Sequence, residues 1–268
     1  MNTVKVQNTL FKSVKSDLNS CTNKYYKNGL ISLKYCILSL YMCKVFEDNY
    51  LKKVAGLNTN LTDGDINKFK KREKELIKMG KSFTDILYEK NYVDMYQHFE
   101  EFMLNTFYIL YKHFPKFIVN RTKDYKIYLD YADLFEVKDV TIGQDRCIYR
   151  LANNIVQRNN IFDIKKKYSN VFSININLTY KQLSEIYTIS NNRNMIVHNN
   201  GKINNIYLSN LKKYNITSKY SENDIITKNI EDEREFSFYF LKKCVKIISN
   251  DLLSNIKQLM KNHESITL

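Results

Sequence analysis

Residues that interrupt helices are scarce along this chain, which holds one proline and six glycines among 268 residues. Proline removes a backbone donor and glycine adds conformational freedom, so both usually mark turns and helix ends. Where they are this rare, long uninterrupted helices are the structure that the backbone adopts most readily. Hydrophobic residues make up 44% of the chain, which is enough for a large buried core. We therefore expect an all-α protein.

Apolar side chains recur at intervals of three and four residues over most of the chain. This spacing predicts helices over about 3–20, 30–53, 65–80, 83–114, 144–167, 179–198 and 231–262. Asn28-Gly29 is expected to separate the first two helices, and Pro115 to end the fourth.

Two stretches do not have helical spacing. Residues 170–177 alternate between polar and apolar and fit a weak strand or an extended loop. Residues 202–230 are rich in lysine and asparagine and are expected to form an irregular surface segment. The predicted organisation is an N-terminal helical region of unknown role over residues 1–80, followed by a helical bundle over residues 83–268.

Basic side chains outnumber acidic ones, 42 against 28, and give a net charge of +14. A polyanion is a reasonable partner, although lysines spread along the chain also fit a generally basic surface. Five cysteines without a Cys-x-x-Cys pair predict buried thiols in a reducing compartment. No two histidines have metal-ligand spacing, so we expect no metal and no cofactor. Without a signal peptide or a long apolar stretch, we expect a cytoplasmic protein that does not enter a membrane.

The stretch most informative about function is Arg193-Asn194-Met195-Ile196-Val197-His198-Asn199-Asn200-Gly201. An imidazole accepts a proton from a ribose 2′-hydroxyl, or donates one to a leaving oxygen, near neutral pH. A guanidinium holds a phosphate and offsets the charge that builds on it in the transition state. On a helix, positions 193 and 198 lie about 140° apart around the axis and about 7.5 Å apart along it. One helix therefore does not easily aim both side chains at a single phosphate.

The string Arg-Asn-x3-His-Asn-x-Gly resembles the active-site signature of the HEPN superfamily, an Arg-x4-His pattern with a polar residue after the arginine. The order of elements is similar too, with a long helix that ends in a proline, two further helices and a closing amphipathic helix. The resemblance covers roughly residues 83–262. It implies a helical bundle that pairs with a second copy to form one composite cleft. HEPN proteins that keep the signature are commonly metal-independent endoribonucleases of toxin–antitoxin, abortive-infection and RNA-guided defence systems.

The resemblance implies that Arg193, Asn194 and His198 are catalytic. His198 would act as general base or acid in attack by the 2′-hydroxyl, and Arg193 would stabilise the charge on the phosphorus. Asn194 lies four residues before His198 and is placed to orient the imidazole, while Gly201 is placed to end the helix in a left-handed conformation. The products would carry a 2′,3′-cyclic phosphate and a 5′-hydroxyl. The expected RNA-binding residues are Lys165, Lys166, Lys167, Lys202 and Asn199.

Other interpretations stay open. The basic, tyrosine-bearing stretches at 112–128, 158–168 and 202–220 either carry an RNA backbone or are solvated loops. A HEPN module without catalysis would bind a nucleotide, RNA or a partner protein in a defence complex. In a basic helical scaffold, Arg193 would be a surface residue and His198 would only interact with the helix dipole. An antitoxin partner is possible in principle, but Asn200 replaces the tyrosine that nucleotidyltransferase antitoxins modify in a subset of HEPN toxins.

Overall fold

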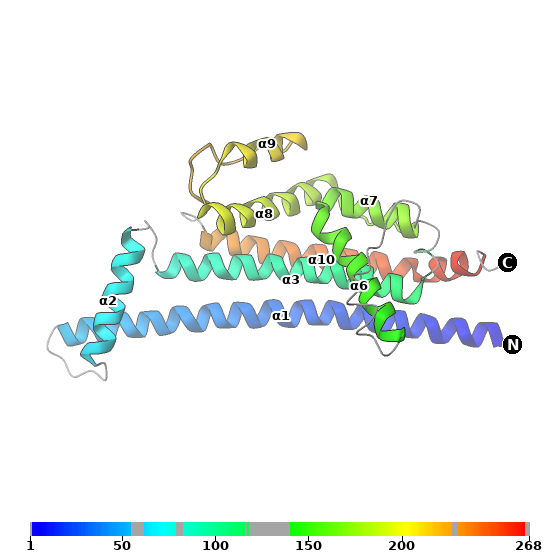
Figure 1. Ribbon diagram of the computed structural model, residues 1–268, viewed down its shortest axis with the longest axis horizontal. Coiled ribbons are helices and arrows are strands. Elements are labelled where there is room, and N and C mark those ends of the chain that lie inside the picture. Colours follow the sequence, from blue (N-terminus) through cyan, green and yellow to red (C-terminus); the bar gives the residue numbers. More distant parts are fainter. Residues whose placement is uncertain are drawn as a thin grey trace. The chain divides into compact units, whose positions relative to one another are not determined.

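The computed structural model describes residues 2–54, 62–78, 83–115, 117, 140–226 and 230–265. The helices are α1 (Asn2–Val54), α2 (Asp63–Lys78), α3 (Phe83–His113), α6 (Val140–Arg158), α7 (Ile161–Phe172), α8 (Tyr180–Asn199), α9 (Asn205–Lys213) and α10 (Ile230–Ser265) (Figure 1). Within these described ranges no strand forms, and the β-pairing present is an isolated antiparallel bridge between Lys202 and Ile225. The expected all-α class is confirmed.

Helix α1 is continuous, so the prediction that Asn28-Gly29 separates two helices is wrong. Gly29 is buried, and a Cβ atom added to it would lie 3.0 Å from Cε2 of Phe238 in α10. A glycine in the middle of a helix costs about 1 kcal/mol relative to alanine. Here the missing side chain lets two helices approach closely, and this packing explains why the glycine does not end the helix.

Two further predictions are wrong because asparagine caps were not recognised. The helix predicted over 144–167 is divided into α6 and α7 at Asn160, whose Oδ1 accepts hydrogen bonds from the backbone N–H groups of Phe162 (2.9 Å) and Asp163 (3.2 Å). Helix α9 lies inside the segment predicted to be irregular, and the Asn204 Oδ1 accepts from the N–H of Tyr207 at 2.9 Å. Asparagine is among the residues that cap helix N-termini best.

Residues 173–179 are extended without forming a strand. Ile174, Ile176 and Leu178 are buried, and the residues between them are exposed. Of the two structures that the alternating pattern left open, the extended loop is the one observed.

The chain forms two compact units, each assembled from separate stretches of sequence. The first comprises residues 1–26, 97–188 and 240–268, and the second comprises residues 27–96 and 189–239. Helices α1, α3, α8 and α10 each contribute residues to both units. A separate functional region over residues 1–80 stays a prediction.

Aromatic side chains of α3 lie at the centre of the first unit, as their helical spacing predicted. Phe102 and Phe107 are at most 2% exposed. The Phe107 ring stacks on Tyr168 of α7 with the ring centroids 4.3 Å apart, and the hydroxyl of Thr106 is hydrogen-bonded to the Tyr168 hydroxyl. On α1, Tyr25 packs against Phe102 with centroids 5.8 Å apart. This core fixes α7 and the first half of α1 on α3.

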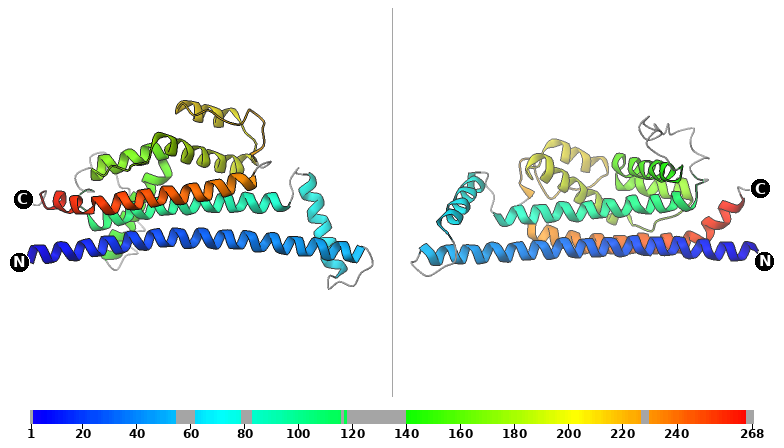
Figure 2. Two further views of the ribbon diagram at one scale, coloured as in Figure 1. Left: turned by 180° about the vertical axis from the view of Figure 1, so that it is seen from behind. Right: turned by 60° about the horizontal axis from the view of Figure 1, so that its bottom comes forward.

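In the second unit, α3 runs between α1 on one side and α8 on the other (Figures 1 and 2). The Cys36 thiol of α1 donates to the carbonyl of Leu87 in α3 at 3.8 Å. From the same helix, the Tyr92 hydroxyl donates to the carbonyl of Ile189 in α8 at 3.4 Å. The sides of α1 and α8 that face away from α3 therefore lie on different sides of this unit.

Candidate active site

The segment from Arg193 to His198 forms the last turns of α8 and belongs to the second unit. The helix begins at a capping box, in which Oγ1 of Thr179 accepts from the N–H of Gln182 (3.2 Å) and Oε1 of Gln182 accepts from the N–H of Thr179 (2.9 Å). Such a box satisfies two backbone donors that a helix start leaves unpaired.

The helix ends directly after the segment. Asn200 has φ of 51° and Gly201 has φ of 76°, so both residues are left-handed. The N–H of Gly201 donates to the carbonyl of Met195 at 2.9 Å and closes the last turn. A left-handed residue after the last helical position is a common way to terminate a helix, and glycine adopts it at no steric cost. The expected left-handed ending at Gly201 is confirmed.

Side chains of the segment differ sharply in exposure. Met195 and Ile196 are buried, at 8% and 7% exposed, and hold the backbone against the core. Arg193 and Asn194 are half-buried, whereas Val197 and His198 are exposed. The imidazole is therefore accessible to solvent although the turn that carries it is anchored.

The guanidinium of Arg193 is oriented by its neighbour. Nη1 of Arg193 donates to Oδ1 of Asn194 at 3.0 Å. Nε of Arg193 is buried and has no hydrogen-bond partner within the described structure. A buried donor left unpaired costs about 1–3 kcal/mol.

His198 has no hydrogen bond to any residue that the structure describes. The Asn194 amide oxygen accepts from Arg193 instead, so the expected contact between Asn194 and the imidazole is not formed among the described residues.

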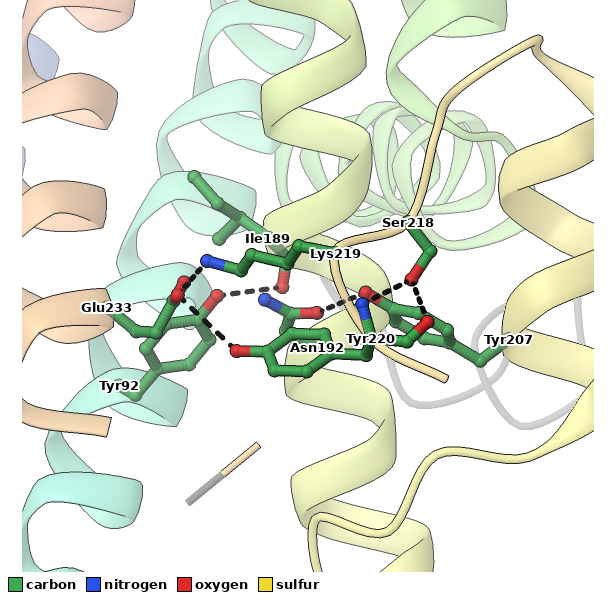
Figure 3. A network of polar contacts seen from close by, with 8 residues as sticks. All are labelled: Tyr92, Ile189, Asn192, Tyr207, Ser218, Lys219, Tyr220 and Glu233. Atoms are coloured by element: carbon green, nitrogen blue, oxygen red, sulfur yellow. Dashed lines mark hydrogen bonds and ion pairs between the residues drawn. The ribbon is translucent and has the colours of Figure 1, made fainter. Parts of the chain in front are cut away.

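A buried polar contact attaches the end of α8 to α9, and polar contacts nearer the surface attach the following loop to α10 (Figure 3). The Tyr207 hydroxyl of α9 donates to Oδ1 of Asn192 at 2.8 Å, and both side chains are at most 1% exposed. In the loop that follows α9, the Tyr220 hydroxyl donates to Oε1 of Glu233 at 3.3 Å, and Lys219 forms an ion pair with the same carboxylate. Burial raises the pKa of Tyr220 to about 12. The Asn192–Tyr207 bond anchors the turn that presents His198.

Asn192 is a positioning residue that the sequence interpretation missed. It occupies the row of α8 that also carries Ile189 and Ile196, at intervals of three and four residues. A polar residue in an apolar row indicates a buried polar contact, because an unpaired amide there would be costly. This signal was present in the sequence, but it did not identify Tyr207 as the partner.

Residues 201–226 leave the end of α8 and return to it. The two ends of this segment are joined by hydrogen bonds from the N–H of Ile203 to the carbonyl of Asp224 (2.8 Å) and from the N–H of Ile226 to the carbonyl of Gly201 (2.9 Å). Two of the expected RNA-binding residues lie at this junction. The Asn199 side-chain amide donates to the Lys202 carbonyl, and the Lys202 side chain is exposed.

The lysine triplet lies elsewhere, on α7 in the first unit. Nζ of Lys165 donates to the carbonyl of Leu178 at 2.8 Å, and Nζ of Lys166 lies 3.5 Å from a carboxylate oxygen of Asp163. Lys165 is thus already engaged by the backbone. The structure brings Arg193, Asn194, His198, Asn199 and Lys202 together in one unit and places the triplet in the other. Of the stretch 112–128, residues 116 and 118–128 lie outside the described residues.

Within the described ranges, no three His, Cys, Asp or Glu side chains are grouped as metal ligands would be. No helix in those ranges combines the length and apolar character that crossing a bilayer requires. No protein-family model, curated protein or solved structure matches this chain. Its function is therefore argued from the site.

Proposed function

We propose that this protein is a metal-independent endoribonuclease that acts as a homodimer. The supporting observation is a contrast within the end of α8. The Arg193 guanidinium is held by Asn194 and keeps one buried N–H unpaired, whereas the His198 imidazole is exposed and has no hydrogen bond among the described residues. An RNA phosphodiester offers anionic oxygens to the Nη groups of the half-buried guanidinium and a hydroxyl proton to the imidazole.

In the proposed reaction, His198 accepts the proton of a ribose 2′-hydroxyl while that oxygen attacks the adjacent phosphorus. The bond between phosphorus and the 5′ oxygen breaks, and the leaving oxygen takes a proton from the imidazolium of the second copy. Arg193 stabilises the additional negative charge on the phosphoryl oxygens. The products are a 2′,3′-cyclic phosphate and a 5′-hydroxyl, and the step consumes neither a metal nor water.

The homodimer is part of the proposal because one α8 carries its two reactive groups about 140° apart. A second copy across a two-fold axis supplies the missing partners. Exposed apolar side chains on α8 and on the segment that follows it support such a contact. Val197 is 45% exposed, and Ile225, which is bridged to Lys202, is 40% exposed. A second copy would cover them.

The direct test is incubation of the purified protein with total RNA in EDTA. We expect fragments with 5′-hydroxyl and cyclic phosphate ends. His198→Ala is expected to lower the cleavage rate by about 10²–10⁴-fold, because general acid–base groups contribute this much. The melting temperature should not change, since the exposed imidazole makes no hydrogen bond to the described residues.

A matched control is His113→Gln in the first unit. This change removes the contact between Nε2 of His113 and the Asp17 carboxylate, 2.7 Å away, and should leave cleavage intact. Undiminished cleavage by His198→Ala, or cleavage that EDTA abolishes, would contradict the proposal. Binding of RNA without cleavage would favour a non-catalytic module instead.

A toxin or antiviral effector is the cellular role that fits such an activity. Expression in bacteria should then arrest growth, and His198→Ala should relieve the arrest. Sequencing the 5′ ends of cellular RNA after induction would identify the cleaved RNA.

A further inference from the structure

In the second unit, one face of α1 carries large apolar side chains that are exposed to solvent. These residues, termed the α1 apolar face, are 40–67% exposed: Leu30, Ile31, Tyr35, Ile37, Leu38, Tyr41 and Met42. At 100° per residue they fall within one arc of about 160° around the helix. The opposite side of α1 carries Gly29 and Cys36, which contact α10 and α3.

The size of this face is unusual for a surface that stays in water. The largest apolar patch of a typical monomer is about 300–600 Å². A stable protein interface needs about 800 Å² from each partner. Seven large side chains, each at least 40% exposed, together present an area of the size that each partner contributes to a stable interface.

Opposite charges lie at the two ends of the α1 apolar face along the helix axis. Lys27 precedes the α1 apolar face, Asp48 follows it, and both side chains are exposed. They lie about 31 Å apart along the helix axis, with their midpoint beside Ile37 and Leu38. An antiparallel second α1 would set each Lys27 opposite the Asp48 of its partner, whereas a parallel one would set the two lysines against each other.

We propose that the α1 apolar face is an interface between two copies of this chain, with their α1 helices antiparallel about a two-fold axis near Leu38. Such an interface is self-complementary in its apolar surface and pairs Lys27 with Asp48, while Lys34, which is exposed within the same arc, would lie opposite Tyr41 of the second copy. Because α3 runs between α1 and α8 in this unit, the interface is separate from the end of α8 (Figures 1 and 2). It exists whether or not the protein cleaves RNA.

The first test measures molar mass by light scattering over a range of protein concentrations. Leu38→Glu places a charge in the middle of the face and should reduce the mass at least twofold. The reduction is expected whether or not the α8 ends also pair, so this result is independent of the nuclease proposal. Tyr180→Glu is the control, because Tyr180 is 56% exposed and lies on α8 in the first unit.

Circular dichroism on both variants verifies that they fold. Equal masses for Leu38→Glu and the wild type would overturn the proposal. A wild type that is monomeric at every concentration would overturn it as well.

The second test measures orientation. Lys27→Glu should weaken association several-fold, and Lys27→Glu combined with Asp48→Lys should restore it. In a parallel pair, the double variant should associate no more strongly than Lys27→Glu alone.

Cross-linking gives a sharper result. With copper phenanthroline as oxidant, Leu38→Cys should form a disulfide-linked dimer, because the two copies of this position lie close to the axis. Leu30→Cys should not, since its two copies would be about 22 Å apart along the helices and a disulfide spans less than about 7 Å between Cα atoms. Equal cross-linking at positions 30 and 38 would overturn the antiparallel arrangement.

Discussion

The end of α8 and the α1 apolar face are both exposed regions of the second unit, but they expose opposite chemistry. At the end of α8, a buried layer that includes Asn192 and Ile196 holds a turn that leaves one guanidinium and one imidazole accessible. On α1, the buried side is narrow and the exposed side is mainly hydrocarbon, with Lys34 among the apolar side chains. A few fixed polar groups suit an anionic ligand, and a broad apolar surface suits another helix. The buried contacts behind an exposed group therefore help to distinguish a reactive site from a docking surface.

The largest expected effect separates the two regions by activity. Arg193→Ala should lower the rate of RNA cleavage by about 10²–10³-fold, because one donor to a developing oxyanion contributes this much. The molar mass of Arg193→Ala in solution should equal that of the wild type, because the α1 apolar face is unchanged. Initial rates on a fluorescent RNA give the measurement, with Arg72→Ala on α2 as the control. A loss of less than twofold for Arg193→Ala would remove the arginine from the mechanism.

The next effect concerns how α1 is held in the second unit. Gly29→Leu forces a side chain into the space that Phe238 occupies and should lower the free energy of unfolding by up to about 3 kcal/mol. Gly29→Ala should change it much less, because a gain in helix propensity of about 1 kcal/mol offsets the closer contact. Urea denaturation measures both variants. If Gly29→Leu were as stable as the wild type, close packing would not be the reason for the glycine.

A smaller effect is expected where the end of α8 is anchored. Tyr207→Phe leaves Oδ1 of Asn192 buried without its donor and should cost about 1–2 kcal/mol of stability. Tyr35→Phe on the α1 apolar face is the matched control, since Tyr35 is 67% exposed. Urea denaturation should show a lower free energy of unfolding for Tyr207→Phe but not for Tyr35→Phe. Equal values for the two variants would mean that the buried contact does not hold the turn.

The smallest effect is a dependence on alkaline pH. Burial raises the pKa of Tyr220 from 10.0 to about 12. Above pH 10 the unfolded chain releases this proton and the folded chain keeps it, so stability should fall as the pH rises from about 10 to about 12. Tyr220→Phe should reduce that slope between pH 9 and pH 11.5 in urea titrations. An unchanged slope would show that burial of this hydroxyl does not contribute.

Elements with strong local signals were predicted well. The apolar spacing along α3 and α10 identified both helices, and Gly201 identified the end of α8. The prediction failed at Gly29, because its reason is the Phe238 ring on a helix distant in sequence. It failed at Asn160 and Asn204 for a local reason, since an asparagine before a helix resembles a loop residue until its side chain is seen to cap.

The candidate site likewise combines features that the sequence predicted with features that it did not. The sequence alone determined that Arg193 and His198 share one helix five positions apart, because helical geometry follows from local spacing. Only the tertiary structure decided that Asn192 pairs with Tyr207 and that Lys165 is engaged by a carbonyl. It also decided that the apolar residues of α1 between 30 and 42 stay exposed. Local spacing sets the direction of a side chain around its helix, whereas burial depends on which distant segment packs against it.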